Sequence, residues 1–155
     1  MNPKARKPAT RARERAPAEA PIPRAEHRVP IESDRDILSA RTQGRALAQQ
    51  LGLPNGDLTL VATAISELAR NIILYARRGE IVLSLVQNDG REGLAVVARD
   101  QGPGIPDIGR ALDVGYSTSG SLGLGLPGVR RLMDDFQIES LTGKGTTVRA
   151  TKWKR

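Results

Sequence analysis

Two glycine-rich segments in the second half of the chain hold the residues best suited to chemistry. One is DQGPGIPD, residues 100–107, and the other is SLGLGLPG, residues 121–128. Alternating glycines let a backbone approach a ligand closely, and glycines that open a helix leave N–H groups free to face an anion. Together the two segments predict a nucleotide pocket.

The first segment begins with an acid, Asp100, that follows the apolar run LAVVA. A carboxylate there can accept a hydrogen bond from an exocyclic amine, while Gly102 and Gly104 let a flat ring approach. The alternative is an aspartate that ends a strand in a tight turn, which Pro103 and Pro106 would stiffen. The D-x-G-x-G pattern alone leaves both interpretations open.

A second polar pair, Glu67 and Asn71, lies on a helix expected over residues 57–76. Apolar residues recur along that helix at spacings of three and four, which predicts a buried stripe of Leu58, Val61, Ile65, Leu68, Ile72 and Tyr75. Glu67 and Asn71 are four residues apart and therefore share one side of the helix. They could act on a ligand or form an ordinary solvated edge, and Arg70 beside them could be solvated or approach a phosphate.

The polar residues 107–122 run from the end of the first glycine-rich segment into the start of the second. They are rich in Gly, Ser and Thr, which predicts a mobile loop long enough to act as a lid. Gly123 and Gly125 then lead into an amphipathic helix that ends near Asp135. The amino end of this helix is an expected anion site because of its dipole and its free N–H groups.

The rest of the chain must form the elements that position these residues. A helix is expected from Ser33 or Asp34 to about Leu51, with Gly52 as its stop, after a short edge strand at residues 27–32. Two apolar strands joined by an NDG turn and a later pair joined by TGKG complete the sheet. These expected strands are Glu80–Gln87, Gly93–Arg99, Phe136–Leu141 and Thr146–Trp153.

The composition limits the domain organisation and the chemistry. A chain of 155 residues with 39% hydrophobic content has enough material for one domain with a core. It contains no cysteine, which excludes disulfides and thiolate sites, and its one histidine, His27, has no partners for a metal site or a triad. No apolar run approaches the roughly 18–20 residues of a membrane helix, so we expect a cytosolic protein.

The net charge of +7 is concentrated in residues 1–28. That segment holds eight Lys or Arg and three Glu, which is +5 of the total, and five prolines. It cannot bury enough apolar surface to offset its ordering entropy, so we expect a disordered basic tail followed by one domain over residues 29–155. The tail could contact nucleic acid or serve as a solubilising extension. It lacks interleaved aromatic residues, so nucleic acid is not an expected partner.

Four segments in a fixed order carry a resemblance to a known family: ELARN, DQGPGIPD, GLGLPG and GKGTT. Together they resemble the ATP-binding boxes of the GHKL superfamily, named for gyrase, Hsp90, histidine kinases and MutL, over about residues 29–155. The resemblance implies the Bergerat fold. This is an α+β two-layer sandwich whose mixed, mostly antiparallel sheet is covered on one face by helices.

Within the superfamily, E-x-x-x-N replaces the N-x-x-x-N of many histidine kinases. The segments SELARNI, DQGPGIPDI, GYSTSGSLGLGLPGVRRLMD and the C-terminal KWKR resemble the RsbT-type switch kinases of the sigma-B regulatory module. No histidine-bearing dimerisation helix or receiver domain is recognisable, so a complete histidine kinase is not expected.

The resemblance implies a role for each candidate residue. Glu67 corresponds to the general base, Asn71 to the Mg²⁺ ligand, and Asp100 to the group that binds the adenine amine. Gly102 and Gly104 would give clearance, Ile105 would pack near the ring, and Thr146 would support the Asp100 end of the pocket. The phosphates would be held by Ser117, Thr118 and the backbone amides of Gly123, Leu124, Gly125 and Leu126.

The implied activity is that of an ATP- and Mg²⁺-dependent protein serine/threonine kinase. Its substrates would be STAS-domain proteins similar to RsbS and RsbR in a stressosome, and it would activate a PP2C-type phosphatase by binding to it. One alternative is a non-catalytic, ATP-modulated binding module of the anti-sigma type. Another is a nucleic-acid binder that acts through its tail.

Overall fold

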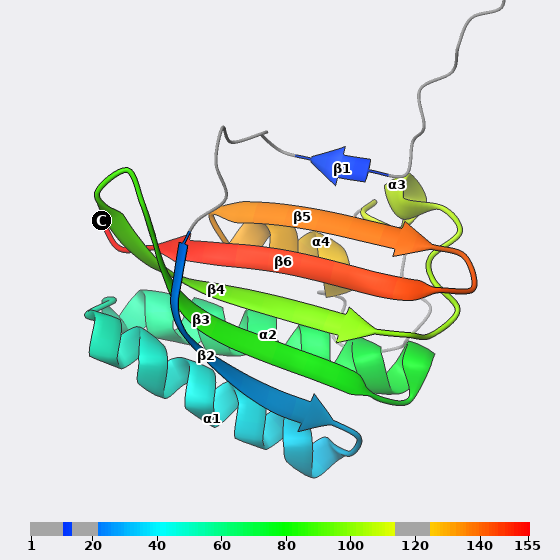
Figure 1. Cartoon of the computed structure of the whole chain (residues 1–155), viewed down its shortest axis with the longest axis horizontal. Coiled ribbons are helices and arrows are strands. Elements are labelled where there is room, and N and C mark those ends of the chain that lie inside the picture. Colours follow the sequence, from blue (N-terminus) through cyan, green and yellow to red (C-terminus); the bar gives the residue numbers. More distant parts are fainter. Residues whose placement is uncertain (1–10, 14–21, 114–124) are drawn as a thin grey trace, which may run out of the picture.

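The computed structural model describes residues 11–13, 22–113 and 125–155 (Figure 1). In chain order these residues form β1 (Arg11–Arg13), β2 (Ile22–Ile31), α1 (Asp34–Leu51), α2 (Asn55–Ala76), β3 (Gly79–Asn88), β4 (Arg91–Asp100), α3 (Ile108–Ala111), α4 (Gly125–Leu132), β5 (Asp135–Leu141) and β6 (Gly145–Trp153).

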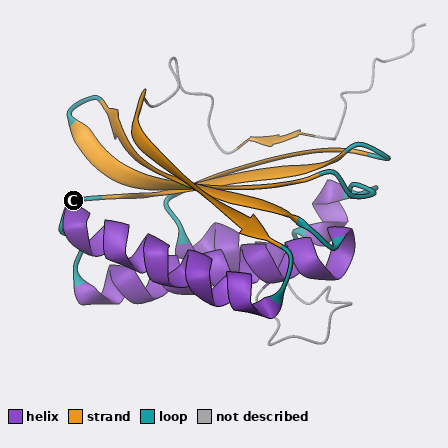
Figure 2. Cartoon of the chain, turned by 60° about the horizontal axis from the view of Figure 1, so that its bottom comes forward, coloured by secondary structure: helices purple, strands orange, loops and turns teal. Residues whose placement is uncertain are grey.

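The described strands form one sheet in the order β1-β5-β6-β4-β3-β2, and every pairing among them is antiparallel. Helices α1, α2 and α4 lie on the same side of this sheet (Figure 2). The expected α+β two-layer fold with helices on one face is confirmed. In the described part the sheet is antiparallel throughout, where some parallel pairing was expected.

Helix α1 begins and ends where local chemistry places its ends. The Asp36 carboxylate accepts hydrogen bonds from the backbone N–H groups of Glu32 and Ser33, at 2.8 and 3.1 Å, just before the first turn. Gly52 follows the last turn with φ 95°, a left-handed conformation that favours glycine, and its N–H donates to Ala48. The predicted ends of this helix are therefore confirmed.

Helix α2 supplies the centre of the core between α1 and the sheet. Its residues Leu58, Val61, Ile65 and Leu68 are at most 2% exposed. Gly44 of α1 lies against it so closely that a Cβ would collide with Ile65. The predicted stripe is thus confirmed as far as Ile72. Tyr75, however, is 51% exposed in the last turn of the helix.

Helix α2 is also long and apolar enough to cross a bilayer. It has 22 residues, and its most apolar window has a mean hydropathy of 1.3. Half of that window is buried inside the fold, against α1 and the sheet. Such burial is typical of a core helix, so the length and composition of α2 are weak grounds for a membrane span.

The hairpin of β3 and β4 turns at Asp89 and Gly90. Both residues have positive φ angles, 52° and 78°, which is the geometry of a two-residue turn whose twist matches that of the strands. The register pairs Asn88 with Arg91 and Gly79 with Asp100. The turn therefore places the end of β4 beside the start of β3.

Strand β2 begins earlier than its composition suggests. It runs from Ile22 to Ile31 and pairs with β3, and its register shifts between Pro23 and Ala25. The strand expected at residues 27–32 is present and begins at Ile22, so residues 22–28, expected to be disordered, lie in a strand. Backbone pairing with β3 orders them, and the irregularity tolerates a proline that lacks an N–H. Three residues of the expected tail, Arg11–Arg13, pair with β5.

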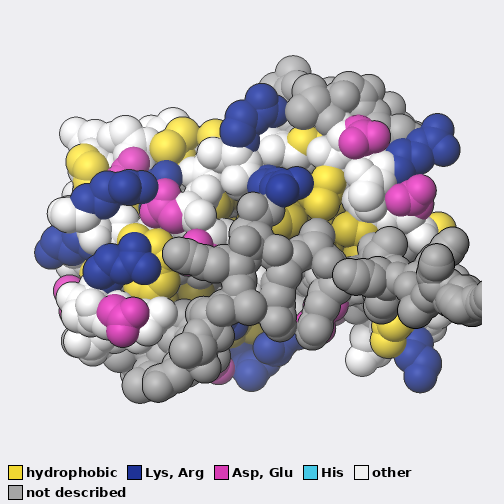
Figure 3. Space-filling view, turned by 90° about the horizontal axis from the view of Figure 1, so that it is seen from above, with side chains coloured by type: hydrophobic (Ala, Val, Ile, Leu, Met, Phe, Trp, Pro, Cys, Tyr) yellow, Lys and Arg dark blue, Asp and Glu magenta, His cyan; other side chains and the backbone are white. Residues whose placement is uncertain are grey.

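Acidic and basic side chains intermingle on the surface seen in Figure 3. This agrees with the small net charge of residues 29–155, which is +2.

On β6, burial lowers the pKa of Arg149 and nearby Arg99 lowers it further, while Glu26 raises it. The guanidinium keeps its charge at any working pH because its ordinary pKa is so high.

Two matched substitutions on α2 test this packing. Replacing Leu68, which is 1% exposed, with Ala should lower the free energy of unfolding by about 2–5 kcal/mol, because it removes buried contacts and leaves a cavity. Leu74→Ala, at a position 49% exposed, should change it by less than about 0.5 kcal/mol. Urea unfolding measures both values, and equal losses would contradict the assigned burial.

Candidate functional site

The loop after β4 is shaped by the Asp100 side chain. Its Oδ1 accepts a hydrogen bond from the Gly102 N–H at 2.8 Å, and the residue is half-buried. Its other carboxylate oxygen makes no hydrogen bond with the described residues. One oxygen of Asp100 therefore stabilises the turn, and the other is available to accept a hydrogen bond from a ligand. The turn interpretation and the ligand interpretation of Asp100 are thus compatible.

Gly102 and Gly104 are required by the packing of the protein itself. A Cβ on Gly102 would lie 2.6 Å from the Cβ of Ala76, the last residue of α2. Gly104 has φ 82°, and a Cβ there would collide with the carbonyl oxygen of Leu141. Because both residues are glycines, the loop can pack closely between α2 and β5. Clearance for a bound ring stays a prediction.

Ser140 of β5 joins the loop to the last two strands. Its hydroxyl accepts the Ile105 N–H at 2.7 Å, donates to the carbonyl of Gly145 at 3.2 Å and lies 2.8 Å from the Thr146 hydroxyl. Thr146 pairs with Asp100 across β4 and β6. The structure thus brings Thr146 and Ile105 to the Asp100 end of the site, and their roles toward a nucleotide stay predictions.

Sequence reasoning missed Ser140. It is 6% exposed and follows Phe136 and Ile138 at spacings of two, so all three point to the same buried face of β5. A serine on the apolar face of a strand was the available signal, because a buried hydroxyl needs partners.

A second cluster forms where α2 meets the start of α4. Glu67 is 6% exposed, and its Oε1 accepts the Gly125 N–H at 3.2 Å. The alternative of a solvated Glu67 is therefore wrong. Asn71 lies one turn further along α2, is half-buried, and makes no hydrogen bond with the described residues. Arg70 is exposed, which leaves its role open.

The expected phosphate residues are described only in part. Gly125 and Leu126 begin α4, and Leu126 is 9% exposed. Ser117, Thr118, Gly123, Leu124 and most of the expected lid lie outside the described residues. Sequence separation between Glu67 and Gly125 is 58 residues, yet the fold places them in contact.

The chemistry of these groups fits a nucleotide with Mg²⁺. The free oxygen of Asp100 can accept an adenine amine, and the Asn71 carboxamide oxygen is a ligand type that Mg²⁺ accepts. Within the described residues no group of three or more His, Asp or Glu could hold a metal ion. Mg²⁺ usually keeps several waters and binds through substrate phosphates, so it needs few protein ligands.

Comparisons with known proteins show the family to which the chain is similar. A model of the histidine kinase-like ATPase domain matches residues 32–152. The chain is 52% identical to the serine/threonine-protein kinase RsbT of Bacillus subtilis over 127 residues, which cover 82% of this chain and 96% of that kinase. It is 32% identical to the anti-sigma F factor of Caldanaerobacter subterraneus and 34% identical to that of Geobacillus stearothermophilus, over 74% and 70% of this chain and 82% and 78% of those factors.

A serine-to-alanine pair tests the junction at Ser140. Ser140→Ala should lower the free energy of unfolding by about 1–3 kcal/mol, because the part-buried Ile105 N–H loses its acceptor and the Gly145 carbonyl loses its donor at a buried position. Ser39→Ala on α1, where the hydroxyl accepts a hydrogen bond from the exposed Gln43 side chain, should change it by less than about 0.5 kcal/mol. Thermal or urea unfolding gives both values. Equal unfolding free energies for the two variants would show that Ser140 does not stabilise the junction.

Proposed function

The chain belongs to the histidine kinase-like ATPase domain family and is an RsbT-type member of it, and we propose that it is an ATP-dependent protein serine/threonine kinase. The observation that carries the proposal is the contact between buried Glu67 and the first amide of α4, with Asn71 one turn away. A carboxylate, a metal ligand and a helix amino end in one place suit phosphoryl transfer, which depends mainly on positioning and charge neutralisation.

The adenine would bind at the end of β4. Asp100 would accept a hydrogen bond from the exocyclic amine with its free oxygen, while its other oxygen stays bonded to Gly102. Ile105 is half-buried and belongs to the edge of the core, so it can pack against a ring. Ser140 and Thr146 hold this loop in place through the hydroxyl contacts described above.

The phosphates would bind at the other end of the pocket, near the start of α4. Gly125 and Leu126 open α4, and helix amino ends favour anions; because Glu67 engages the Gly125 N–H here, that amide would have to share its hydrogen bond to reach a phosphate. Ser117, Thr118, Gly123 and Leu124 are proposed as further phosphate contacts. Asn71 would hold Mg²⁺, which when bound neutralises the charge that develops on the transferring phosphoryl group.

Glu67 would act as the general base. The serine or threonine oxygen of the substrate attacks the γ-phosphorus, the bond from that phosphorus to the bridging oxygen breaks, and ADP leaves. The hydroxyl proton passes to the oxygen of Glu67 that Gly125 does not engage. The Gly125 N–H fixes the orientation of the carboxylate, so the base does not have to be ordered during the reaction.

The proposed substrates are STAS-domain proteins of the RsbS and RsbR type, within a partner-switching module of the cytoplasm. Release from them would let the kinase bind and activate a PP2C-type phosphatase. The resemblance to RsbT, at 52% identity, supports this placement over more distant members of the family.

A second candidate is a binding module that uses ATP as a conformational ligand. Its support is the set of anti-sigma F factors that are 30–35% identical to this chain. Incubation with labelled ATP and a STAS-domain partner separates the two. Transfer of label to Ser or Thr supports the kinase, whereas a stable partner complex with bound, unconsumed ATP supports the module.

Two substitutions test the division of work within the site. Glu67→Ala should stop transfer and leave ATP binding largely intact, because it removes the base. Asp100→Asn should weaken ATP binding by about ten- to one-hundredfold, since a hydrogen bond to a charged group contributes about 1.5–3 kcal/mol. Asparagine has one oxygen, which the Gly102 N–H already engages.

Asp107→Asn is the matched control, because Asp107 lies in the same loop and only caps α3 through the Arg110 N–H. Its ATP affinity should equal that of the unmodified protein in calorimetry. Equal loss of binding in the Glu67 and Asp100 variants would show that the division is wrong.

A further inference from the structure

Lys152 is a buried cation that the proposed reaction does not use. It lies on β6, two residues after Ala150 on the strand face toward the helices, and it is 6% exposed. A buried ammonium group is costly unless charged or polar partners surround it. A lysine at this position therefore indicates a specific set of contacts.

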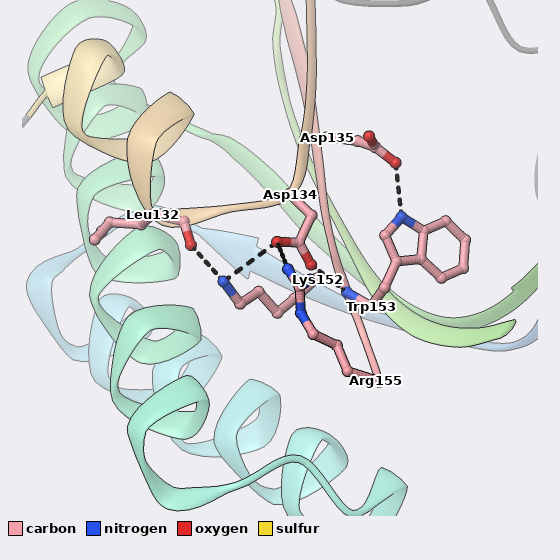
Figure 4. A network of polar contacts seen from close by, with 6 residues as sticks. All are labelled: Leu132, Asp134, Asp135, Lys152, Trp153 and Arg155. Carbon is pink, nitrogen blue, oxygen red and sulfur yellow. Dashed lines mark hydrogen bonds and ion pairs between the residues drawn. The ribbon is translucent and has the colours of Figure 1, made fainter.

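The lysine binds the carboxyl end of α4. Its Nζ donates to the carbonyl of Leu132, the last residue of that helix, at 2.9 Å (Figure 4). The last carbonyls of a helix lack partners within the helix, and a cation there is favoured by the helix dipole. Lys152 thus acts as a C-terminal cap supplied by a neighbouring strand.

Asp134 completes the network on the other side of Lys152. Its Oδ1 lies 3.6 Å from the Lys152 Nζ and accepts from the Arg155 guanidinium at 2.8 Å, while its Oδ2 accepts the Trp153 N–H at 2.8 Å. The Asp134 N–H also donates to the carbonyl of Thr151. The segment that follows α4 is therefore tied to β6 through both side chain and backbone.

The opposite end of α4 makes the contact on which the proposed reaction depends. Helix α4 has eight residues, about 12 Å of axis, so a shift at one end is carried to the other. A helix this short depends on tertiary contacts for its stability. Its first amide, that of Gly125, donates to the general-base candidate Glu67 at 3.2 Å.

We propose that Lys152 is a positioning residue, which fixes α4 at Leu132 and so sets the Gly125 amide against Glu67. Among the described residues, the partners of the lysine are Leu132 and Asp134, and neither Glu67 nor a residue proposed to contact ATP is one of them. Its effect on the site passes through the helix. This gives the C-terminal KWKR segment, which includes Lys152 and Arg155, a role that the ATP-binding boxes leave unassigned.

The test follows amide hydrogen exchange in the full-length, ¹⁵N-labelled protein without nucleotide. In Lys152→Met, exchange of the Gly125 amide should become about tenfold faster relative to core amides of β4, a factor typical of the loss of one hydrogen bond. A purely structural loss would accelerate both sets of amides together. Lys152→Arg keeps the charge and the donor, and should restore the relative protection of Gly125.

Arg155→Met is the matched control. Arg155 binds the same Asp134 carboxylate but is 74% exposed and has no described contact with α4. The relative exchange of Gly125 should be unchanged in this variant. Unchanged relative exchange in Lys152→Met, or an equal change in Arg155→Met, would overturn the proposal. If Lys152→Met does not fold, Lys152→Gln takes its place, because its shorter side chain does not reach Leu132.

One arm of the experiment rests on the proposed function. Lys152→Met should bind ATP more weakly while its affinity for adenosine, which lacks phosphates, stays the same. If the unmodified protein does not bind ATP, the proposed function fails. The exchange experiment still decides the role of Lys152, because it needs no nucleotide.

Discussion

Close packing around the end of β4 is the constraint on which the site depends. Glycines surround Asp100 and the residues next to it, and a side chain at most of these positions would meet protein backbone or Asp100 itself. A Cβ on Gly79 would collide with the carbonyl of Arg99, one on Gly104 with that of Leu141, and one on Gly145 with that of Asp100. The glycine-rich sequence is therefore explained first by the need to bring α2, β3, β4 and the β5–β6 hairpin together.

Helix α2 connects the two ends of the proposed pocket. Its last residue, Ala76, packs against Gly102 beside Asp100, while Glu67 lies nine residues earlier and meets α4. At 1.5 Å per residue these positions are about 14 Å apart along the helix. The proposed adenine and phosphate ends would thus share one helix, whose apolar stripe is buried in the core. The network at Lys152 would hold α4 in place against α2.

Features with local causes could be predicted from the sequence. The ends of α1 follow from Ser33 and Gly52, the β3–β4 turn from Asp89 and Gly90, and the buried stripe of α2 from its spacing. Features that depend on tertiary contact could not. The burial of Glu67, the junction at Ser140, the cap at Lys152 and the early start of β2 each need a partner far away in the chain. The resemblance identified the ATP-binding boxes in the sequence, whereas only the structure showed which of their residues are in contact.

The central claim is that Asp100 faces the adenine while the phosphates lie at the start of α4. A structure determined with Mg²⁺ and a non-hydrolysable ATP analogue tests it most directly. The account predicts the exocyclic amine about 3 Å from the Asp100 carboxylate, and phosphate oxygens near Gly125 and Asn71. A phosphate group against the Asp100 loop, with the adenine at α4 or outside the site, would contradict it.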